Sequence, residues 1–186
     1  MDVETFNLLF ALLTVVANVA VVVFTATAVA ARSSERAAAF RDDLWDRVGE
    51  VAVPMAFGVS LTATLGSLYY SEIANFSPCE LCWYQRIAMY PLPILLAVAW
   101  RRGDRAVRRY VMPLALIGAA ISIYHYQLER FPDQAGFSCA VDNPCTLVWV
   151  WMFRYISIPF MALSGFALIA WLTWIAGQRA QAPARG

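Results

Sequence analysis

Two cysteine pairs are the residues of this sequence with the most distinctive chemistry. Cys79 and Cys82 form a C-x-x-C within "NFSPCELCWYQRIAMYPLP", and Cys139 and Cys145 lie in the later stretch "GFSCAVDNPCTL". Closely spaced cysteine pairs indicate redox or metal chemistry, because thiols with only a packing role need not be paired in sequence. The first pair stands at the start of an apolar run. A helix beginning there would lower the pKa of the thiols through its N-terminal partial positive charge.

Two other residues could take part in the same chemistry. Arg86 follows Cys82 by one helical turn, on the same face and about 6 Å deeper. A cation just below the membrane surface can stabilise an anion, such as a quinone undergoing reduction. His125, the only histidine, stands near the end of a later apolar segment, at about the depth of Arg86. Judged by its neighbours alone, a histidine among tyrosines is more often a helix-end residue than a ligand.

The elements that must position these residues are membrane helices. The chain is 61% hydrophobic and 15% charged, whereas soluble domains are close to half apolar and a quarter charged. The net charge of +1 and the lack of any basic patch argue against a nucleic-acid partner. A membrane-spanning helix needs about 20 mostly apolar residues. Five stretches qualify: 6–31, 51–74, 83–100, 110–128 and 156–176.

The arginines predict the orientation of these spans, because positively charged loops stay in the cytoplasm. They gather in the links after the first and third spans and in the tail, whereas the start "MDVET" is acidic. We therefore expect the N-terminus outside, the C-terminus in the cytoplasm, and residues 75–82 and 129–155 outside. Both cysteine pairs would then face the oxidising side of a plasma or inner membrane.

The N-terminal part of the chain is divided by its composition. The first span lacks a positive n-region and is too long for a signal-peptide core, so we expect it to be retained. Residues 32–50 mix charges with apolar residues at helical spacing, which predicts a helix on the inner membrane surface. We therefore divide the chain into this N-terminal part (1–50), a redox helix bundle (51–176) and a cytoplasmic tail (177–186).

Other chemistries fit parts of this pattern. A four-cysteine zinc site fits the count, but an oxidising compartment does not keep four thiols free. Purely structural disulfides would resist exchange and would need no quinone. An electron exporter would need cysteines within spans or facing the cytoplasm, and the predicted topology offers none.

The stretches "LGSLYYSEIANFSPCELCWYQRIAMYPL", "ISIYHYQLE" and "SIPF" resemble the DsbB family of membrane disulfide oxidoreductases, most closely its BdbC branch. The resemblance covers about residues 51–176. It implies an all-α integral membrane four-helix bundle that holds a quinone, either menaquinone or ubiquinone, and reoxidises an extracytoplasmic thioredoxin-fold oxidant of the DsbA or BdbD type. The first span is one helix more than the family usually has. A vitamin K epoxide reductase-like enzyme would carry its C-x-x-C after the loop pair, the reverse of the order here.

The resemblance also implies roles for the residues that match the family. Cys79 and Cys82 match the quinone-facing pair, with Cys82 nearer the quinone and held as a thiolate. By order in the chain, Cys139 would take the partner's thiolate and Cys145 would attack Cys79. Arg86 would support both the quinone and the Cys82 thiolate.

The family also has a histidine close to the quinone. His125 matches it, which favours a cofactor-binding role for this residue. No metal site is implied.

Overall fold

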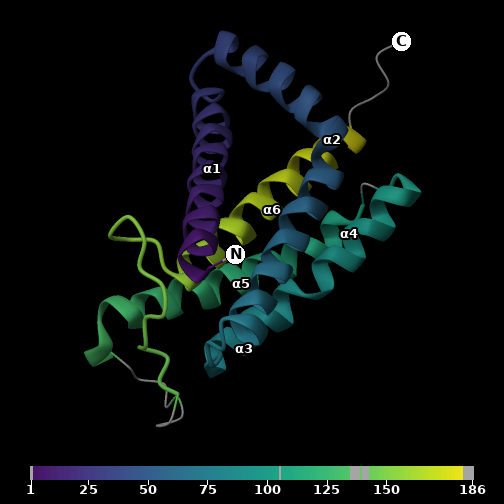
Figure 1. Cartoon of the computed structure of the whole chain (residues 1–186). Helices are drawn as coiled ribbons and strands as arrows, with labels where there is room; N and C mark the ends of the chain where they lie inside the picture. Colours follow the sequence, from purple (N-terminus) through teal and green to yellow (C-terminus); the bar gives the residue numbers. More distant parts are fainter. Residues whose placement is uncertain (1, 105, 135–138, 140–142, 182–186) are drawn as a thin grey trace.

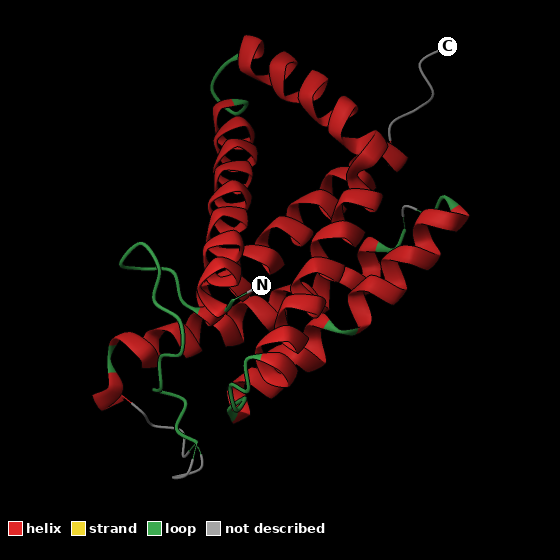
Figure 2. Ribbon diagram, in the orientation of Figure 1, coloured by secondary structure: helices red, strands yellow, loops and turns green. Residues whose placement is uncertain are grey.

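The computed structural model describes residues 2–104, 106–134, 139 and 143–181. Its α-helices are α1 (Val3–Ala30), α2 (Glu35–Leu68), α3 (Glu80–Met89), α4 (Pro91–Arg102), α5 (Arg108–Arg130) and α6 (Ile158–Gln181). Two short helices, η1 (Tyr69–Ile73, π) and η2 (Pro132–Gln134, 3₁₀), complete the regular structure. The described residues contain no strand (Figure 2), which confirms the all-α prediction.

The prediction of five membrane spans is confirmed, since five helical segments are long and apolar enough to cross a bilayer. The third of them is not one smooth helix but the pair α3 and α4, which meet at Tyr90. Pro91 and Pro93 follow at once and have no N–H groups, so the backbone bonds that would continue α3 cannot form. Nothing is described for Arg105, Asp142 and 182–186, which belong to the arginine-rich link, the cysteine loop and the tail.

The predicted surface helix of residues 32–50 is not a separate element. It is helical, but from Glu35 it is continuous with the second span as α2, with Pro54 inside. Figure 1 shows the first part of α2 running obliquely to the rest. Pro54 accounts for a bend, because it removes one backbone bond and its ring presses on the carbonyl four residues earlier.

The bundle is held together by close packing of α6 on α1, α2 and α5. The core is apolar, with Leu92 and Leu96 of α4 fully buried beside Phe166 and Ile169 of α6. A Cβ added at Gly118 of α5 would collide with the Phe166 ring. Only a glycine allows α5 and α6 to approach this closely, as small residues do at membrane helix interfaces.

The α5–α6 loop and the start of α3 lie at the end of the bundle where the chain begins (Figure 1), and the four cysteines, which these segments contribute, belong to one cluster. The Tyr70 hydroxyl donates to Asn7 Oδ1 at 2.9 Å, which ties the start of α1 to η1. At the same end Asn143 Nδ2 lies 3.4 Å from the carbonyl oxygen and from Oγ of Ser77, so the long α5–α6 loop meets the η1–α3 link. The fold thus brings the two pairs together.

Candidate active site

The Cys79–Cys82 pair marks the beginning of α3. Pro78 precedes it, and Cys79 is the N-cap residue in an extended conformation. Its Sγ accepts a hydrogen bond from the Cys82 backbone N–H at 3.4 Å and lies 3.0 Å from Cys82 Sγ. Both cysteines are free thiols here. The helix start predicted from the sequence therefore falls on the pair itself.

The negative charge of this dithiol is best accommodated on Cys79, which precedes the membrane span. A hydrogen bond with the Cys82 thiol is the main cause that lowers the pKa of Cys79 to about 4; burial opposes this shift, and His125 adds to it. The family resemblance had suggested Cys82 as the thiolate. In the dithiol form Cys79 is favoured instead, because it holds the N-cap position and accepts a hydrogen bond from the Cys82 backbone N–H.

His125 lies behind Cys79 rather than against the arginine. Its Nε2 is 3.6 Å from Cys79 Sγ, and its Nδ1 is 3.5 Å from Gln85 Nε2. His125 is 2% exposed and Gln85 6% exposed. The imidazole therefore contacts the Cys79 thiol on one side and the Gln85 amide on the other. Gln85 was not predicted from the sequence as a residue of the site.

Arg86 is buried and is held by the second span. Its Nε donates to Ser67 Oγ at 3.0 Å and its Nη2 to the Ser67 carbonyl oxygen at 3.0 Å. Its Cζ also lies 5.2 Å from the ring centroid of Trp83. Among the described residues no acidic side chain pairs with Arg86. The guanidinium thus has a fixed position and a charge that its surroundings leave uncompensated.

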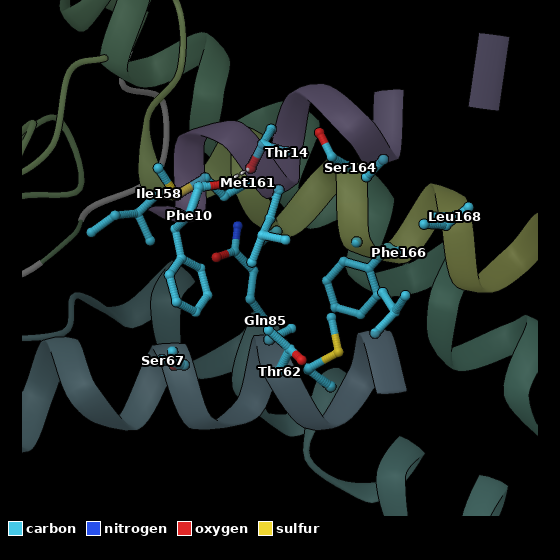
Figure 3. Close-up of a pocket in the computed structure, with 18 of the residues that line it drawn as sticks. Phe10, Thr14, Thr62, Ser67, Gln85, Ile158, Met161, Ser164, Phe166 and Leu168 are labelled. Atoms are coloured by element: carbon cyan, nitrogen blue, oxygen red, sulfur yellow. Dashed lines mark hydrogen bonds between the residues drawn. The ribbon is translucent and has the colours of Figure 1, made fainter. Parts of the chain in front are cut away.

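A cavity of about 520 Å³ opens next to the pair and the arginine. Most of its wall is apolar, contributed by α1, α2 and α6, as Figure 3 shows for Phe10, Met161 and Phe166. Its polar lining at the cysteine end includes Ser67, Tyr70, Cys82, Gln85 and Arg86. His125 does not line this cavity. It lines a separate small one with Cys79, Cys82 and Glu129.

The second cysteine pair is a disulfide, Cys139–Cys145, with Cα atoms 5.9 Å apart. The two sulfurs differ in their surroundings. Cys145 is 2% exposed and packs in one buried cluster with Cys79, whereas Cys139 is only partly buried. Pro144 lines the small cavity behind the C-x-x-C. Cys145 is therefore the loop cysteine that is buried with the first pair.

Three soft ligand atoms also come together here. Sγ of Cys79, Sγ of Cys82 and a ring nitrogen of His125 all lie within 4.8 Å of one another. A four-cysteine zinc site does not fit this structure, because Cys139 and Cys145 are joined to each other. Two thiols and an imidazole are what a thiol redox centre and a soft-metal site have in common.

Comparison with known proteins places this site in a family. Residues 50–179 match the family described as "Disulfide bond formation protein DsbB". The chain belongs to the DsbB family. It is 52% identical over 112 residues to disulfide bond formation protein C of Bacillus subtilis, covering 60% of this chain and 81% of that protein. No solved structure shows a significant match.

Other relatives agree with the BdbC branch predicted from the sequence. A probable disulfide formation protein C of Bacillus cereus is 46% identical over 128 residues, covering 68% of this chain and 91% of the relative. A probable disulfide formation protein of Deinococcus radiodurans is 45% identical over 131 residues, covering 64% and 85%. This DsbB-family chain is therefore a multi-pass membrane protein of disulfide bond formation, and an oxidoreductase.

Several residues of this DsbB-family site were missed in the sequence. Ser67 holds Arg86, Gln85 joins His125 to the cavity wall, and Glu129 lines the small cavity beside Cys79. The available signal was weak: Ser67 and Gln85 are polar residues inside two apolar segments, and Glu129 comes directly after a third, all near the end where the cysteines stand. The helix α1 was also missed as a part of the site, although it lines the large cavity.

Proposed function

We propose that the protein is a membrane dithiol:quinone oxidoreductase. It reoxidises an extracytoplasmic thioredoxin-fold oxidant of the DsbA or BdbD type and so supports disulfide formation in exported proteins. The observation that carries the proposal is a C-x-x-C with two free thiols at the polar end of a large apolar cavity. Beside it lies the buried Arg86, which pairs with no acidic side chain among the described residues.

The cavity suits a quinone, the cofactor used by the DsbB family. Its volume of about 520 Å³ lies in the usual range for small-molecule sites, which combine apolar walls with a few polar groups. Arg86, held by Ser67, would donate to a quinone oxygen, and the Gln85 amide is a second polar group on the wall. The apolar remainder accepts the tail of either menaquinone or ubiquinone.

Electrons enter through the loop disulfide. A thiolate of the reduced partner attacks Cys139, the less buried sulfur, so a partner–Cys139 disulfide forms and Cys145 leaves as a thiolate. Cys145 is packed with Cys79, and it attacks Cys79 in an oxidised Cys79–Cys82 pair. The new Cys145–Cys79 disulfide releases Cys82 as a thiolate. The implied Cys82 thiolate thus belongs to this stage of the cycle, when Cys79 is no longer available.

The remaining exchange restores the loop. The partner's second thiolate attacks its own mixed disulfide and leaves oxidised, which frees the Cys139 thiolate. Cys139 then attacks Cys145, so the loop disulfide reforms and Cys79 becomes a thiolate. The result is a loop disulfide with a reduced C-x-x-C, the form described here. The pair returns to a disulfide when two electrons and two protons pass to a quinone, the chemistry that the cofactor supplies when bound.

The histidine behind the pair can support its charge. His125 contacts Cys79 through Nε2 and Gln85 through Nδ1. The Gln85 contact is made by the amide NH2 group, which can only donate, so Nδ1 accepts and the imidazole proton is on Nε2. We propose that His125 donates this proton toward the Cys79 sulfur and so stabilises the thiolate from behind the pair.

The proposal also keeps the predicted topology and domain division. The N-terminus and both cysteine pairs would face outside, with the arginine-rich links and the tail 177–186 in the cytoplasm. Residues 51–176 would form the redox bundle, and residues 1–50 an N-terminal addition. What supports this is the packing of the two cysteine pairs in one cluster and the start of the family match at residue 50.

The test is quinone reduction by the purified protein supplied with a reduced thioredoxin-fold oxidant, using menaquinone and ubiquinone in parallel. Cys82→Ser should abolish turnover. Arg86→Met should weaken it about tenfold or more, because a buried charged hydrogen bond is lost. Arg108→Met is the matched control, since Arg108 also stacks on a tryptophan, Trp174, but on α5 away from the cavity. No turnover with either quinone, while all four cysteines stay in disulfides that resist exchange, would support a purely structural role.

A further inference from the structure

We infer that α1 forms one wall of the quinone site and binds the apolar tail of the cofactor. This inference rests on the proposed quinone function and extends it to a helix that the family match, residues 50–179, does not include. The helix therefore has a role in cofactor binding and is more than a membrane anchor.

One face of α1 lines the large cavity. Phe10, Thr14, Ala17, Ala20 and Phe24 all belong to its wall. They recur every three or four residues, which puts them in one row along the helix. Figure 3 shows Phe10 and Thr14 of α1 facing Ser67 and Thr62 of α2, with α6 residues closing the third side. The Thr14 hydroxyl donates to the Phe10 carbonyl oxygen at 2.7 Å, so this face offers mainly apolar surface.

At the cysteine end, α1 reaches the residues that fix the arginine. The Phe10 ring fits against Gly66, where an added Cβ would collide with it. The next residue, Ser67, accepts the hydrogen bonds of Arg86. The same wall of α1 therefore begins beside the polar end of the cavity and continues away from it.

The length of this wall indicates which part of a quinone it contacts. Phe10 and Phe24 are fourteen residues apart, which corresponds to about 21 Å along a helix. A quinone ring beside Cys82 and Arg86 needs only the polar end of such a channel. The rest, lined by Ala20, Phe24 and their apolar neighbours, fits a long hydrocarbon chain. A tail attached to that ring is the occupant that uses both ends at once, whereas a lipid acyl chain has no need of the arginine.

The cavity opens between α1 and α2. Leu13 and Val16 of α1 line it and are 43% and 67% exposed, and Met55 of α2 lines it and is 45% exposed. Exposed apolar residues at membrane depth face lipid. A tail dissolved in the bilayer can therefore pass sideways between the two helices, with α1 as one edge of the opening.

Two hydrogen bonds hold α1 in this position. Asn18 Nδ2 donates to Ser164 Oγ of α6 at 3.0 Å, and Asn7 Oδ1 accepts from the Tyr70 hydroxyl at 2.9 Å. Polar contacts between membrane helices favour one arrangement of the pair, because an unpaired amide in hydrocarbon is costly. α1 is thus fixed to η1 and to α6, and Tyr70 and Ser164, the residues that hold it, both line the cavity.

The first experiment maps contact directly. The full-length protein in detergent is photolysed with a menaquinone or ubiquinone analogue carrying a diazirine at the end of its isoprenoid tail, and the labelled peptides are identified by mass spectrometry. We expect label on α1 between residues 13 and 24, reduced by excess unlabelled long-tailed quinone. Label on the other helices but not on α1 would overturn the inference.

The second experiment compares binding of long-tailed and tailless quinones. Ala20→Phe fills the channel from α1, and Ala26→Phe is the matched control, an exposed alanine of the same helix outside the cavity. Displacing about two methylene groups from the apolar wall should weaken binding of the long-tailed quinone about tenfold. Binding of the tailless quinone and thiol exchange with the partner should not change. Gly58→Leu fills the opening from α2, where an added Cβ meets nothing within 4 Å, and should act in the same way.

Equal binding of the long-tailed quinone by the wild type and both channel-filling variants would refute the role of α1. An equal loss for tailed and tailless quinones would also refute it, because the variants would then act on the ring site or on folding. A wild-type protein that binds neither quinone and shows no turnover would instead refute the proposed function itself.

Discussion

The thiol hydrogen bond within the C-x-x-C gives a prediction that can be worked out in detail. Cys79 Sγ lies 3.0 Å from Cys82 Sγ, and the hydrogen bond with the Cys82 thiol is the largest cause of the low pKa of Cys79, about 4. A hydrogen bond to a charged group contributes about 1.5–3 kcal/mol, and one pKa unit corresponds to about 1.4 kcal/mol. Replacing Cys82 by alanine should therefore raise the pKa of Cys79 by about one to two units.

Serine at the same position is the informative comparison. Cys82→Ser keeps an O–H donor near the sulfur, and Cys82→Ala removes the donor. Each variant has a single free thiol, Cys79, while the loop disulfide stays closed. A pKa of about 4 means that Cys79 is a thiolate above this pH and a thiol below it. The pH range of ionisation should thus move upward in the alanine variant only.

The assay is a pH titration of the thiolate absorbance in the ultraviolet, corrected with Cys79→Ser, which has no thiol at the N-cap. It does not require a reagent to reach a sulfur that is only 6% exposed. We expect a midpoint near 4 in the serine variant and about one to two units higher in the alanine variant. Coinciding midpoints would show that the helix start and His125 set the ionisation of Cys79, and that the Cys82 thiol does not.

Further predictions concern the arginine and the helix packing. Ser67→Ala removes one of the two hydrogen bonds from Arg86 and should weaken quinone binding about tenfold. Ser60→Ala, which removes a buried hydroxyl of the same helix that donates to the Phe57 carbonyl outside the cavity wall, should have little effect in the same binding titration. Gly118→Ala forces a methyl group against the buried phenyl ring of α6 and should destabilise the bundle by about 1–3 kcal/mol. Thermal unfolding in detergent would measure this, with Gly58→Ala, where the space is open, as the control; equal unfolding temperatures would contradict the packing argument.

Much of the fold could be predicted because its signals are local. Five apolar segments of sufficient length predict the five spans, and Cys79 with the apolar run behind it predicts the start of α3. The continuity of α2 from Glu35 was missed, since a charged segment followed by an apolar one looks like two elements. Proline marks the break at Tyr90, but the sequence does not say whether a membrane helix tolerates it or is divided by it.

The contacts of the site were harder to predict, because they depend on which helix faces which. Arg86 and Cys82 were expected on one helix face, and both line the cavity, yet nothing in the sequence names Ser67 as the partner of Arg86 on α2. His125 was expected at the depth of Arg86, but its depth does not reveal that it contacts Cys79 and Gln85 from the other side. Spacing along one helix fixes a face, and only the packing of two helices fixes a pair.

The helix α1 shows how far such reasoning can be taken. Asn7 and Asn18 are eleven residues apart, which is close to three turns, so both lie on one side of an otherwise apolar helix. Amides within a span are expected to face protein and to find a partner there, and they do, on η1 and α6. A helix that only anchored the chain in the membrane would not need a side that carries two amides. The two amides therefore mark α1 as part of the bundle, and the cavity that its neighbouring face lines supplies the reason for holding it there.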